Sequence, residues 1–423
     1  MKYMIYENLV AHANNEHQIP IYSYEEWNEF CAEYAIEGET RPGKTRIMPE
    51  LLRFIDERKP ALPIKRPTHE EMAKAFYGLK KTNYTNHVIT RFDPESVQNK
   101  FKEVVPVEFL ISSGANFNDV SNRFHGDNRY SCGWHNYPST QELWASPFQK
   151  TTVTLAAVLA FLWRDFDGFE ADRDVTKWRL AFGLSGGYVA AQFKPAVAQT
   201  VYDYYRAEKV IDMSCGWGDR LAGFYTSNLT KEYLGCDPNI ASYELYKKQC
   251  RAYEELLSSP LVPNEVSFQD NGDHFEIRGE KRVRIYNLPA EDMDWQGVVE
   301  QPHDLMFSSP PYFKTETYAL GQPGEDKQSW KRYSAYEGWR DKFLFKVIDD
   351  FQEVVTGPIA INIVDPVTNS KRHFLEQDME ERYGIKNILG MRINRRPTGV
   401  KGDQQNVLDD GSQLKYIEPV YIL

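Results

Sequence analysis

The most informative stretch of the chain reads Val210-Ile-Asp-Met-Ser-Cys-Gly-Trp-Gly-Asp-Arg-Leu221. It starts with apolar residues, reaches Asp212, passes through Ser214, Gly216 and Gly218, and then becomes amphipathic. We interpret it as a buried strand, a glycine-rich turn and the first turn of a helix. Glycine permits the positive φ that a tight turn requires, and its missing β-carbon lets a ligand approach the backbone. In open α/β sheets such turns lie at the carboxyl ends of strands, where ligands bind.

This glycine turn is not the dinucleotide-binding fingerprint. Its spacing is G-x-G, and the third glycine of G-x-G-x-x-G is missing. Taken alone, the stretch is therefore compatible with a ligand-binding turn and with a purely structural one.

A second stretch, Asp304-Leu-Met-Phe-Ser-Ser-Pro-Pro-Tyr-Phe313, favours the ligand-binding interpretation. It reads as another apolar strand that ends in Ser309, Pro310, Pro311 and Tyr312. Two successive prolines fix φ twice and remove two N–H donors, so nearby carbonyls stay free to accept hydrogen bonds. Rigid acceptors beside an aromatic ring are suited to holding a planar group that carries an NH2.

Together, the two stretches resemble motifs I and IV of the S-adenosylmethionine-dependent DNA amino-methyltransferases of phages and bacteria. These enzymes act in DNA modification and restriction–modification, on the exocyclic nitrogen of cytosine or adenine. Their motif IV reads [D/N/S]-P-P-[Y/F], and the Ser-Pro-Pro-Tyr form is typical of, though not exclusive to, the N4-cytosine enzymes. The resemblance covers residues 176–423 and does not extend to residues 1–150.

The resemblance implies a set of residues that bind S-adenosylmethionine. The Phe193-Lys-Pro195 element resembles motif X, whose Phe would close over the methionine end of the cofactor. Asp237 ends the second strand, where an acid can take the ribose hydroxyls. Asp292 follows the third strand and would accept from the adenine amino group, with Glu291 as an alternative. The full predicted set is Phe193, Pro195, Asp212, Ser214, Gly216, Gly218, Asp237 and Asp292.

The predicted catalytic residues are Ser309, Pro310, Pro311 and Tyr312. The Ser309 hydroxyl and the Pro310 carbonyl would accept the two N–H bonds of the target amine, which frees its lone pair to attack the methyl group. Tyr312, together with Phe313, would stack on the base. Because a base inside a duplex cannot reach such a pocket, it must be flipped out or come from a single strand.

From residue 208 onwards, apolar strands alternate with helical stretches, which predicts a doubly wound, mostly parallel α/β sheet. The last two strands are separated by a polar stretch, so we expect a hairpin with one antiparallel strand. Seven strands ending in a hairpin match the class I methyltransferase fold. We expect a catalytic domain over residues 176–423 and a mainly helical or irregular accessory domain over residues 1–150. The predicted strands are Lys209–Met213, Tyr233–Asp237, Arg284–Leu288, Asp304–Ser308, Ile359–Val364, Ile388–Ile393 and Val420–Leu423.

The distribution of charge bears on the expected partner, DNA. The net charge is −11, which argues against general binding of polyanions. Residues 41–81 nevertheless hold eleven Lys or Arg against five acids, an excess of six. This segment is either a phosphate-contacting face or a solvated helix surface. A second basic group near the C-terminus is predicted to contact phosphates and comprises Arg392, Arg395, Arg396 and Lys401.

The remaining features favour a cytoplasmic enzyme that binds neither a metal nor a membrane. Five scattered cysteines without a C-x-x-C pair argue against a zinc site or a disulfide framework. The N-terminus lacks the apolar core of a signal peptide. Other functions stay open: methylation of adenine N6, the same chemistry on RNA or a protein glutamine, or a non-catalytic or otherwise base-modifying relative. The oligomeric state is not predicted.

Overall fold

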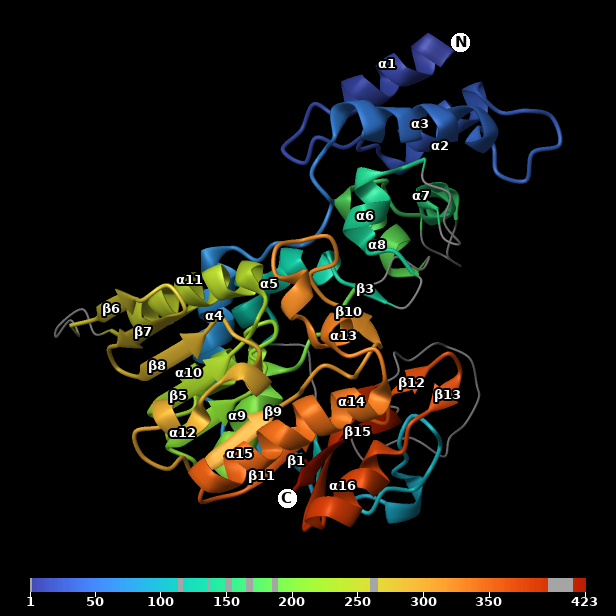
Figure 1. Ribbon diagram of the computed structural model, residues 1–423. Coiled ribbons are helices and arrows are strands. Elements are labelled where there is room, and N and C mark those ends of the chain that lie inside the picture. Colours follow the sequence, from blue (N-terminus) through green and yellow to red (C-terminus); the bar gives the residue numbers. More distant parts are fainter. Residues whose placement is uncertain are drawn as a thin grey trace. The chain divides into compact units, whose positions relative to one another are not determined.

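The computed structural model describes residues 2–112, 117–134, 137–148, 154–164, 170–184, 189–258, 265–394 and 414–423 (Figure 1). The chain forms two compact units, the first made of Met1–Arg66 with Arg129–Ala190, the second of Pro67–Asn128 with Ala191–Leu423. This division differs from the boundary expected near residues 150–175. Residues 67–128 belong to the same unit as the sheet because their apolar side chains lie in its core.

The first unit is mainly helical, as predicted for this part of the chain. Its second helix begins with a capping box, in which the side chains of Ser23 and Glu26 each accept a hydrogen bond from the other's backbone N–H. Aromatic side chains dominate its core, including Trp27, Phe30 and Trp178. The helices are α1 (Lys2–His12), α2 (Tyr24–Glu33), α3 (Lys44–Arg58), α6 (Thr140–Ala145), α7 (Leu155–Leu159) and α8 (Val175–Leu184).

The second unit is built on one sheet that contains all seven predicted strands. The strand order across the described sheet is β1-β2-β14-β15-β11-β9-β4-β5-β8-β7-β6. The bounds, in that order, are Val88–Ile89, Leu110–Ile111, Asn387–Asn394, Leu414–Ile422, Ile359–Asn362, Leu305–Ser308, Lys209–Asp212, Glu232–Cys236, Arg282–Tyr286, His274–Arg278 and Ser267–Asp270.

The direction of the strands confirms the class I methyltransferase fold. Strands β11, β9, β4, β5 and β8 are parallel to one another, whereas β15 is antiparallel to both β11 and β14. This is the hairpin with one antiparallel strand that the sequence predicts. Four edge strands were not predicted, namely the β6–β7 hairpin on one side and the short β1 and β2 on the other.

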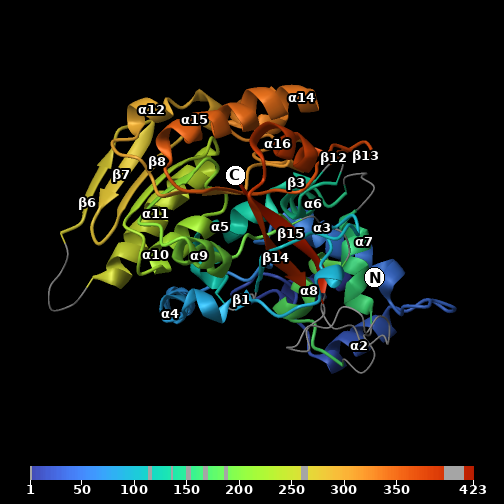
Figure 2. The ribbon, with the colours of Figure 1, turned by 90° about the horizontal axis from the view of Figure 1, so that it is seen from below.

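Helices cover both faces of the sheet, and each face has its own apolar core. Figure 2 shows α12, α14 and α15 on the opposite side of the strands from α9 and α10. The first layer comprises α4 (His69–Lys80), α5 (Asp119–Tyr130), α9 (Pro195–Tyr204), α10 (Asp219–Thr226) and α11 (Ile240–Leu257). The second comprises α12 (Trp295–Val298), α14 (Tyr336–Trp339), α15 (Lys346–Val354) and α16 (Leu375–Tyr383). The sheet is therefore the middle of three layers, and the loops at the carboxyl ends of its central strands lie along one edge.

Two kinds of site are absent from the residues that the structure describes. No helix among them is long and apolar enough to cross a membrane. No group of three or more His, Cys, Asp or Glu side chains among them is placed to hold a metal ion. The five cysteines are all buried with free thiols, at Cys31, Cys132, Cys215, Cys236 and Cys250.

Candidate active site

The turn after β4 requires glycine at two positions, Gly216 and Gly218, and the space around the two residues differs. Both have a positive φ, 59° at Gly216 and 68° at Gly218. A β-carbon at Gly218 would lie 2.2 Å from Oε1 of Gln249 and 2.8 Å from Nε2 of His125, so no side chain fits there. At Gly216 the nearest neighbouring atom would be 3.7 Å away. The turn is therefore packed from behind at Gly218 and less crowded at Gly216, which suits close approach of a ligand to the Gly216 backbone.

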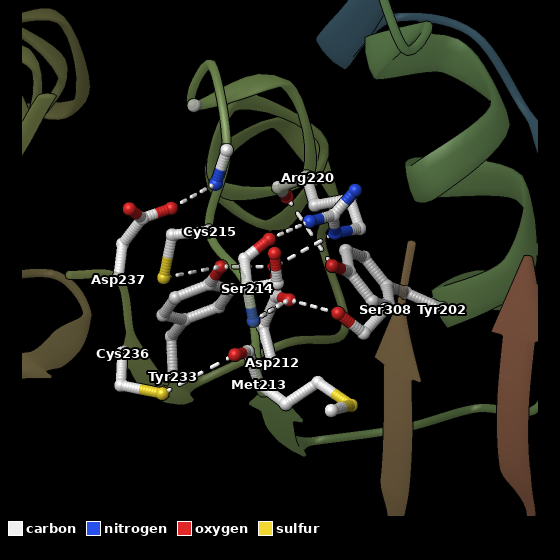
Figure 3. Close-up of polar contacts among 12 residues, drawn as sticks. Tyr202, Asp212, Met213, Ser214, Cys215, Arg220, Tyr233, Cys236, Asp237 and Ser308 are labelled. Carbon is white, nitrogen blue, oxygen red and sulfur yellow. Dashed lines mark hydrogen bonds and ion pairs between the residues drawn. The ribbon is translucent and has the colours of Figure 1, made fainter. Parts of the chain in front are cut away.

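Asp212 holds this turn in place from inside the protein (Figure 3). Its carboxylate accepts hydrogen bonds from Nε of Arg220 and from the hydroxyls of Tyr233 and Ser308, each at 2.7 Å. The backbone N–H of Ser214 adds a fourth at 3.1 Å. Because Asp212 is fully buried and its oxygens are occupied, the direct cofactor contact predicted for it is replaced by a positioning role.

Asp237 follows β5 and lies against the glycine turn, where the sequence places it. One oxygen accepts from the Gly216 N–H at 2.8 Å and from the Tyr246 hydroxyl at 3.2 Å, the other from the Asn239 N–H at 2.9 Å. Burial raises the pKa of Asp237 to about 6. A carboxylate offers about four acceptor positions, so these three bonds leave capacity for one further donor, such as a ribose hydroxyl.

The Phe193-Lys-Pro195 element lies beside the same turn. Pro195 is the first residue of α9, a position that suits its fixed φ and missing N–H. The half-buried Phe193 ring has the Arg220 guanidinium 5.3 Å from its centre and contacts Phe307 of β9 edge-on. Phe193 is thus brought together with the turn through Arg220, the partner of Asp212.

The acids after β8 are both engaged by a later segment of the chain. Asp292 is exposed and forms two hydrogen bonds of 2.9 Å with the guanidinium of Arg332. Glu291 is buried, which raises its pKa, and it accepts from the Tyr333 hydroxyl at 2.9 Å and pairs with Arg332 at 2.8 Å. Both acids predicted as partners of an adenine therefore hold Arg332.

That later segment, residues 314–339, also contacts the glycine turn. The Tyr318 ring lies 5.8 Å from the ring of Trp217, centre to centre. A β-carbon at Gly324 would be 3.2 Å from the Pro238 carbonyl, next to Asp237. The segment therefore follows the carboxyl edge of the sheet. Two of its aromatic residues, Tyr336 and Trp339, are buried in the core.

The Ser-Pro-Pro-Tyr stretch leaves β9 next to the end of β4. The Ser309 hydroxyl is 3.5 Å from the Tyr312 hydroxyl, which is itself 3.5 Å from the Asn362 carbonyl at the end of β11. The Pro311 carbonyl accepts from the Phe313 N–H at 2.9 Å, whereas the Pro310 carbonyl receives no hydrogen bond from any described residue. The acceptor role predicted for Ser309 and Pro310 stays a prediction, and their oxygens are available for it among the described residues.

Phe313 does not lie where stacking on a base would require it. It has a φ of 52° and is only 3% exposed. Its ring packs against Tyr336, Trp339 and His373. Its role in stacking is therefore corrected to one in the core, and the half-buried Tyr312 is left as the aromatic neighbour of Ser309.

Of the four basic residues near the C-terminus that are predicted to contact phosphate, the structure describes Arg392. Arg392 lies within β14 and is 1% exposed, so it cannot reach a phosphate. Arg395, Arg396 and Lys401 lie outside the described residues. The basic stretch 41–81 is divided between the two units, with α3 in the first and α4 in the second. It therefore does not form one face of one compact unit.

Helix α5 supports the glycine turn, although no motif in the sequence identified it. His125 Nε2 and Gln249 Oε1 are 3.0 Å apart, and Gln249 Nε2 donates to the Gly218 carbonyl at 2.8 Å. Near the start of α5, Ser121 donates to Asp219, the first residue of α10. These contacts are between single polar residues far apart in sequence, which is why spacing could not reveal them.

Comparison with known proteins adds little to this geometry. No family model matches the chain, and no curated protein does. Solved structures that align with it include the methyltransferase domain of bacterial CtHen1-CN, with 13% identity, a TM-score of 0.31, and coverage of 54% of this chain and 97% of that chain. An rRNA methylase from Streptococcus thermophilus aligns with 12% identity, a TM-score of 0.29 and coverage of 55% and 97%. TehB from Haemophilus influenzae aligns with 12% identity, a TM-score of 0.29 and coverage of 57% and 65%. TM-scores of this size do not establish a shared fold, so the fold class rests on the strand order.

Proposed function

We propose that this chain is an S-adenosylmethionine-dependent methyltransferase that modifies the exocyclic amino group of a nucleobase, N4 of a flipped-out cytosine in DNA. One observation carries the proposal. The hydrogen bond from Ser308 to Asp212 joins the glycine turn to the start of the Ser-Pro-Pro-Tyr stretch. A cofactor on the turn and an amine held by Ser309 and Pro310 would then lie on one edge of the sheet.

The residues around the turn fit the cofactor. Gly216 offers space for a ligand against its backbone, and Asp237 retains acceptor capacity beside it. Phe193, which lies beside Arg220, would cover the ligand, and the rings of Trp217 and Tyr318 would form an aromatic side of the site. When bound, S-adenosylmethionine would supply a sulfonium-activated methyl group.

The chain itself would position and polarise the amine. The lone pair of an exocyclic amine is delocalised into the base, so the nitrogen is a weak nucleophile. Hydrogen bonds from its two N–H groups to Ser309 Oγ and the Pro310 carbonyl let the nitrogen become more tetrahedral. Both acceptors are fixed before the base arrives, Pro310 by its ring and Ser309 by the adjoining strand, which is the form of electrostatic catalysis that costs least reorganisation.

Cytosine is the proposed base because Ser-Pro-Pro-Tyr is the motif form that resembles the N4-cytosine enzymes. The acceptor pair itself would also serve adenine N6, and Tyr312 could stack on either ring. DNA as the partner is likewise a proposal, with recognition by the first unit and by residues of the 395–413 stretch. Methylation of RNA or of a protein glutamine is the main competing outcome.

Identification of the methylated product tests this assignment. The full chain would be incubated with methyl-labelled S-adenosylmethionine and, in parallel, with single-stranded DNA, duplex DNA, RNA and a glutamine-containing peptide mixture. Digestion of the nucleic acids to nucleosides should place the label in N4-methylcytosine. Label in N6-methyladenine would replace the base, and label only in RNA or peptide would replace the substrate class.

A further inference from the structure

The proposed reaction requires a group that takes up a proton. When a neutral amine accepts a methyl group, its nitrogen becomes cationic and must lose one of its hydrogens. Ser309 and Pro310 can accept hydrogen bonds, but a hydroxyl and an amide carbonyl are too weakly basic to keep the proton. A carboxylate on the same edge of the sheet is the type of side chain that can.

Most carboxylates on this edge are already engaged by other residues. Asp212 holds Arg220, and Asp237 is bound to the glycine turn. Asp365, which follows β11, accepts from Nε of Arg372 at 2.8 Å and from the backbone of α16. Asp212 and Asp365 are each held by an arginine, and the remaining acceptor position of Asp237 is assigned to the cofactor in the proposed function, so none of the three would receive the proton.

Glu418 differs from these acids in its position and in its hydrogen bonding. Strand β15 runs antiparallel to β11, and its Val420 pairs with Asn362. Asn362 Nδ2 donates to the Pro419 carbonyl at 2.9 Å, and the Asn362 carbonyl is 3.5 Å from the Tyr312 hydroxyl. Glu418 therefore lies just beyond the end of β11, on the carboxyl edge where Tyr312 lies. No described residue donates a hydrogen bond to its carboxyl group.

Several charged and titratable groups lie close enough to Glu418 to influence its pKa or to be influenced by its charge. Burial raises the pKa of Tyr312, and the charge of Glu418 raises it further. Burial also raises the pKa of Glu418 itself to about 7, with Glu316 raising it further and Lys100 lowering it. The charge of Glu418 also acts to raise the pKa of Tyr416, on the same strand, and that of Lys100, which burial lowers. Near neutral pH, such a carboxyl can both gain and release a proton.

We propose that Glu418 accepts the proton that the target nitrogen loses on methylation. The inference rests on the proposed function. The nitrogen lone pair forms the new bond to the methyl carbon while the carbon–sulfur bond breaks and leaves its electron pair on sulfur. The cationic nitrogen then gives one proton to the Glu418 carboxylate, which later releases it to water. Charge and atoms balance without any further reactant.

The test is the pH dependence of single-turnover methyl transfer to single-stranded DNA by the full chain. A base must be deprotonated to act, so the wild-type rate should rise with pH to a plateau above about 7. Glu418→Gln should lower the plateau rate roughly 10²-fold and remove this rise. Glu316→Gln should shift the rise to lower pH and Lys100→Gln to higher pH, each with a nearly unchanged plateau.

A second measurement separates this role from a structural one. In protein carrying 13C-labelled glutamate, the carboxyl signal lost in Glu418→Gln should titrate near pH 7 in the absence of substrate. Cofactor affinity and thermal stability of Glu418→Gln should match the wild type. A Glu418→Gln protein with the wild-type rate and pH profile would overturn the role of Glu418 and leave the proposed function standing. A loss of rate that is matched by a loss of thermal stability would do the same. Absence of methyl transfer by the wild type at every pH would instead overturn the proposed function.

Discussion

The Ser308 hydroxyl donates a hydrogen bond to the Asp212 carboxylate across 2.7 Å, although the two residues are 96 positions apart in the chain. Both are fully buried. Asp212 ends the strand that leads into the glycine turn, and Ser308 ends the strand that leads into Ser-Pro-Pro-Tyr. The bond fixes the relative position of the two segments on which the proposed reaction depends.

Replacing Ser308 should therefore lower the free energy of unfolding more than replacing its neighbour Ser309 does. Ser308→Ala removes a donor to a buried charged group, so unfolding in urea should become easier by about 1.5–3 kcal/mol. Ser309→Ala is the matched control, since the only contact of its hydroxyl in the described structure is 3.5 Å long. Equal stability of the two variants would show that the Ser308–Asp212 bond does not hold the site together.

The two glycines of the turn should respond differently to the same change. Gly216→Ala should destabilise the fold by about 1–2 kcal/mol because alanine is strained at a positive φ. It should also weaken S-adenosylmethionine binding, because the added methyl group enters the space of the ligand. Gly218→Ala adds a clash with Gln249 and should destabilise the fold more. Urea unfolding and calorimetric titration distinguish the two effects. Unchanged cofactor affinity in a folded Gly216→Ala would move the ligand away from this turn.

Cofactor binding should depend on pH through Asp237. Its pKa in the folded protein is about 6, and a ribose hydroxyl donates best to the ionised carboxylate. The dissociation constant should therefore be constant above that pH and rise below it, by up to about tenfold per pH unit. Asp237→Ala should weaken binding at neutral pH at least about tenfold, or 1.4 kcal/mol, and abolish the dependence. The same pH profile in wild type and variant would remove Asp237 from the site.

The catalytic unit should not survive removal of residues 1–175. Such a chain lacks α4 and α5, whose Phe76 and Val120 are fully buried in the core beneath the sheet. Loss of a single buried Phe side chain typically costs about 3–5 kcal/mol, so the truncated protein should show no cooperative thermal unfolding by circular dichroism. Cooperative unfolding together with cofactor binding would restore the domain boundary near residue 176.

The sequence reveals the seven central strands because each is an apolar run between a helix and a turn. It does not reveal β6, whose residues are exposed or half-buried, since no apolar pattern distinguishes this edge strand from a loop. Charge alone suggests that Arg392 is exposed, whereas its position within a paired strand buries it. The motif stretches were found, but the partners of Asp212 come from three other segments, which only the folded chain brings together.

Methyl transfer by the wild-type chain and by Ser309→Ala is the most direct test of the proposed function. With labelled S-adenosylmethionine and single-stranded DNA, the wild type should transfer the label to the nucleic acid. Ser309→Ala keeps the fold and the turn but lacks one of the two amine acceptors, so its single-turnover rate should fall roughly 10²-fold while cofactor affinity stays the same. Full activity of Ser309→Ala, or no transfer by the wild type to any nucleic acid, would contradict the account.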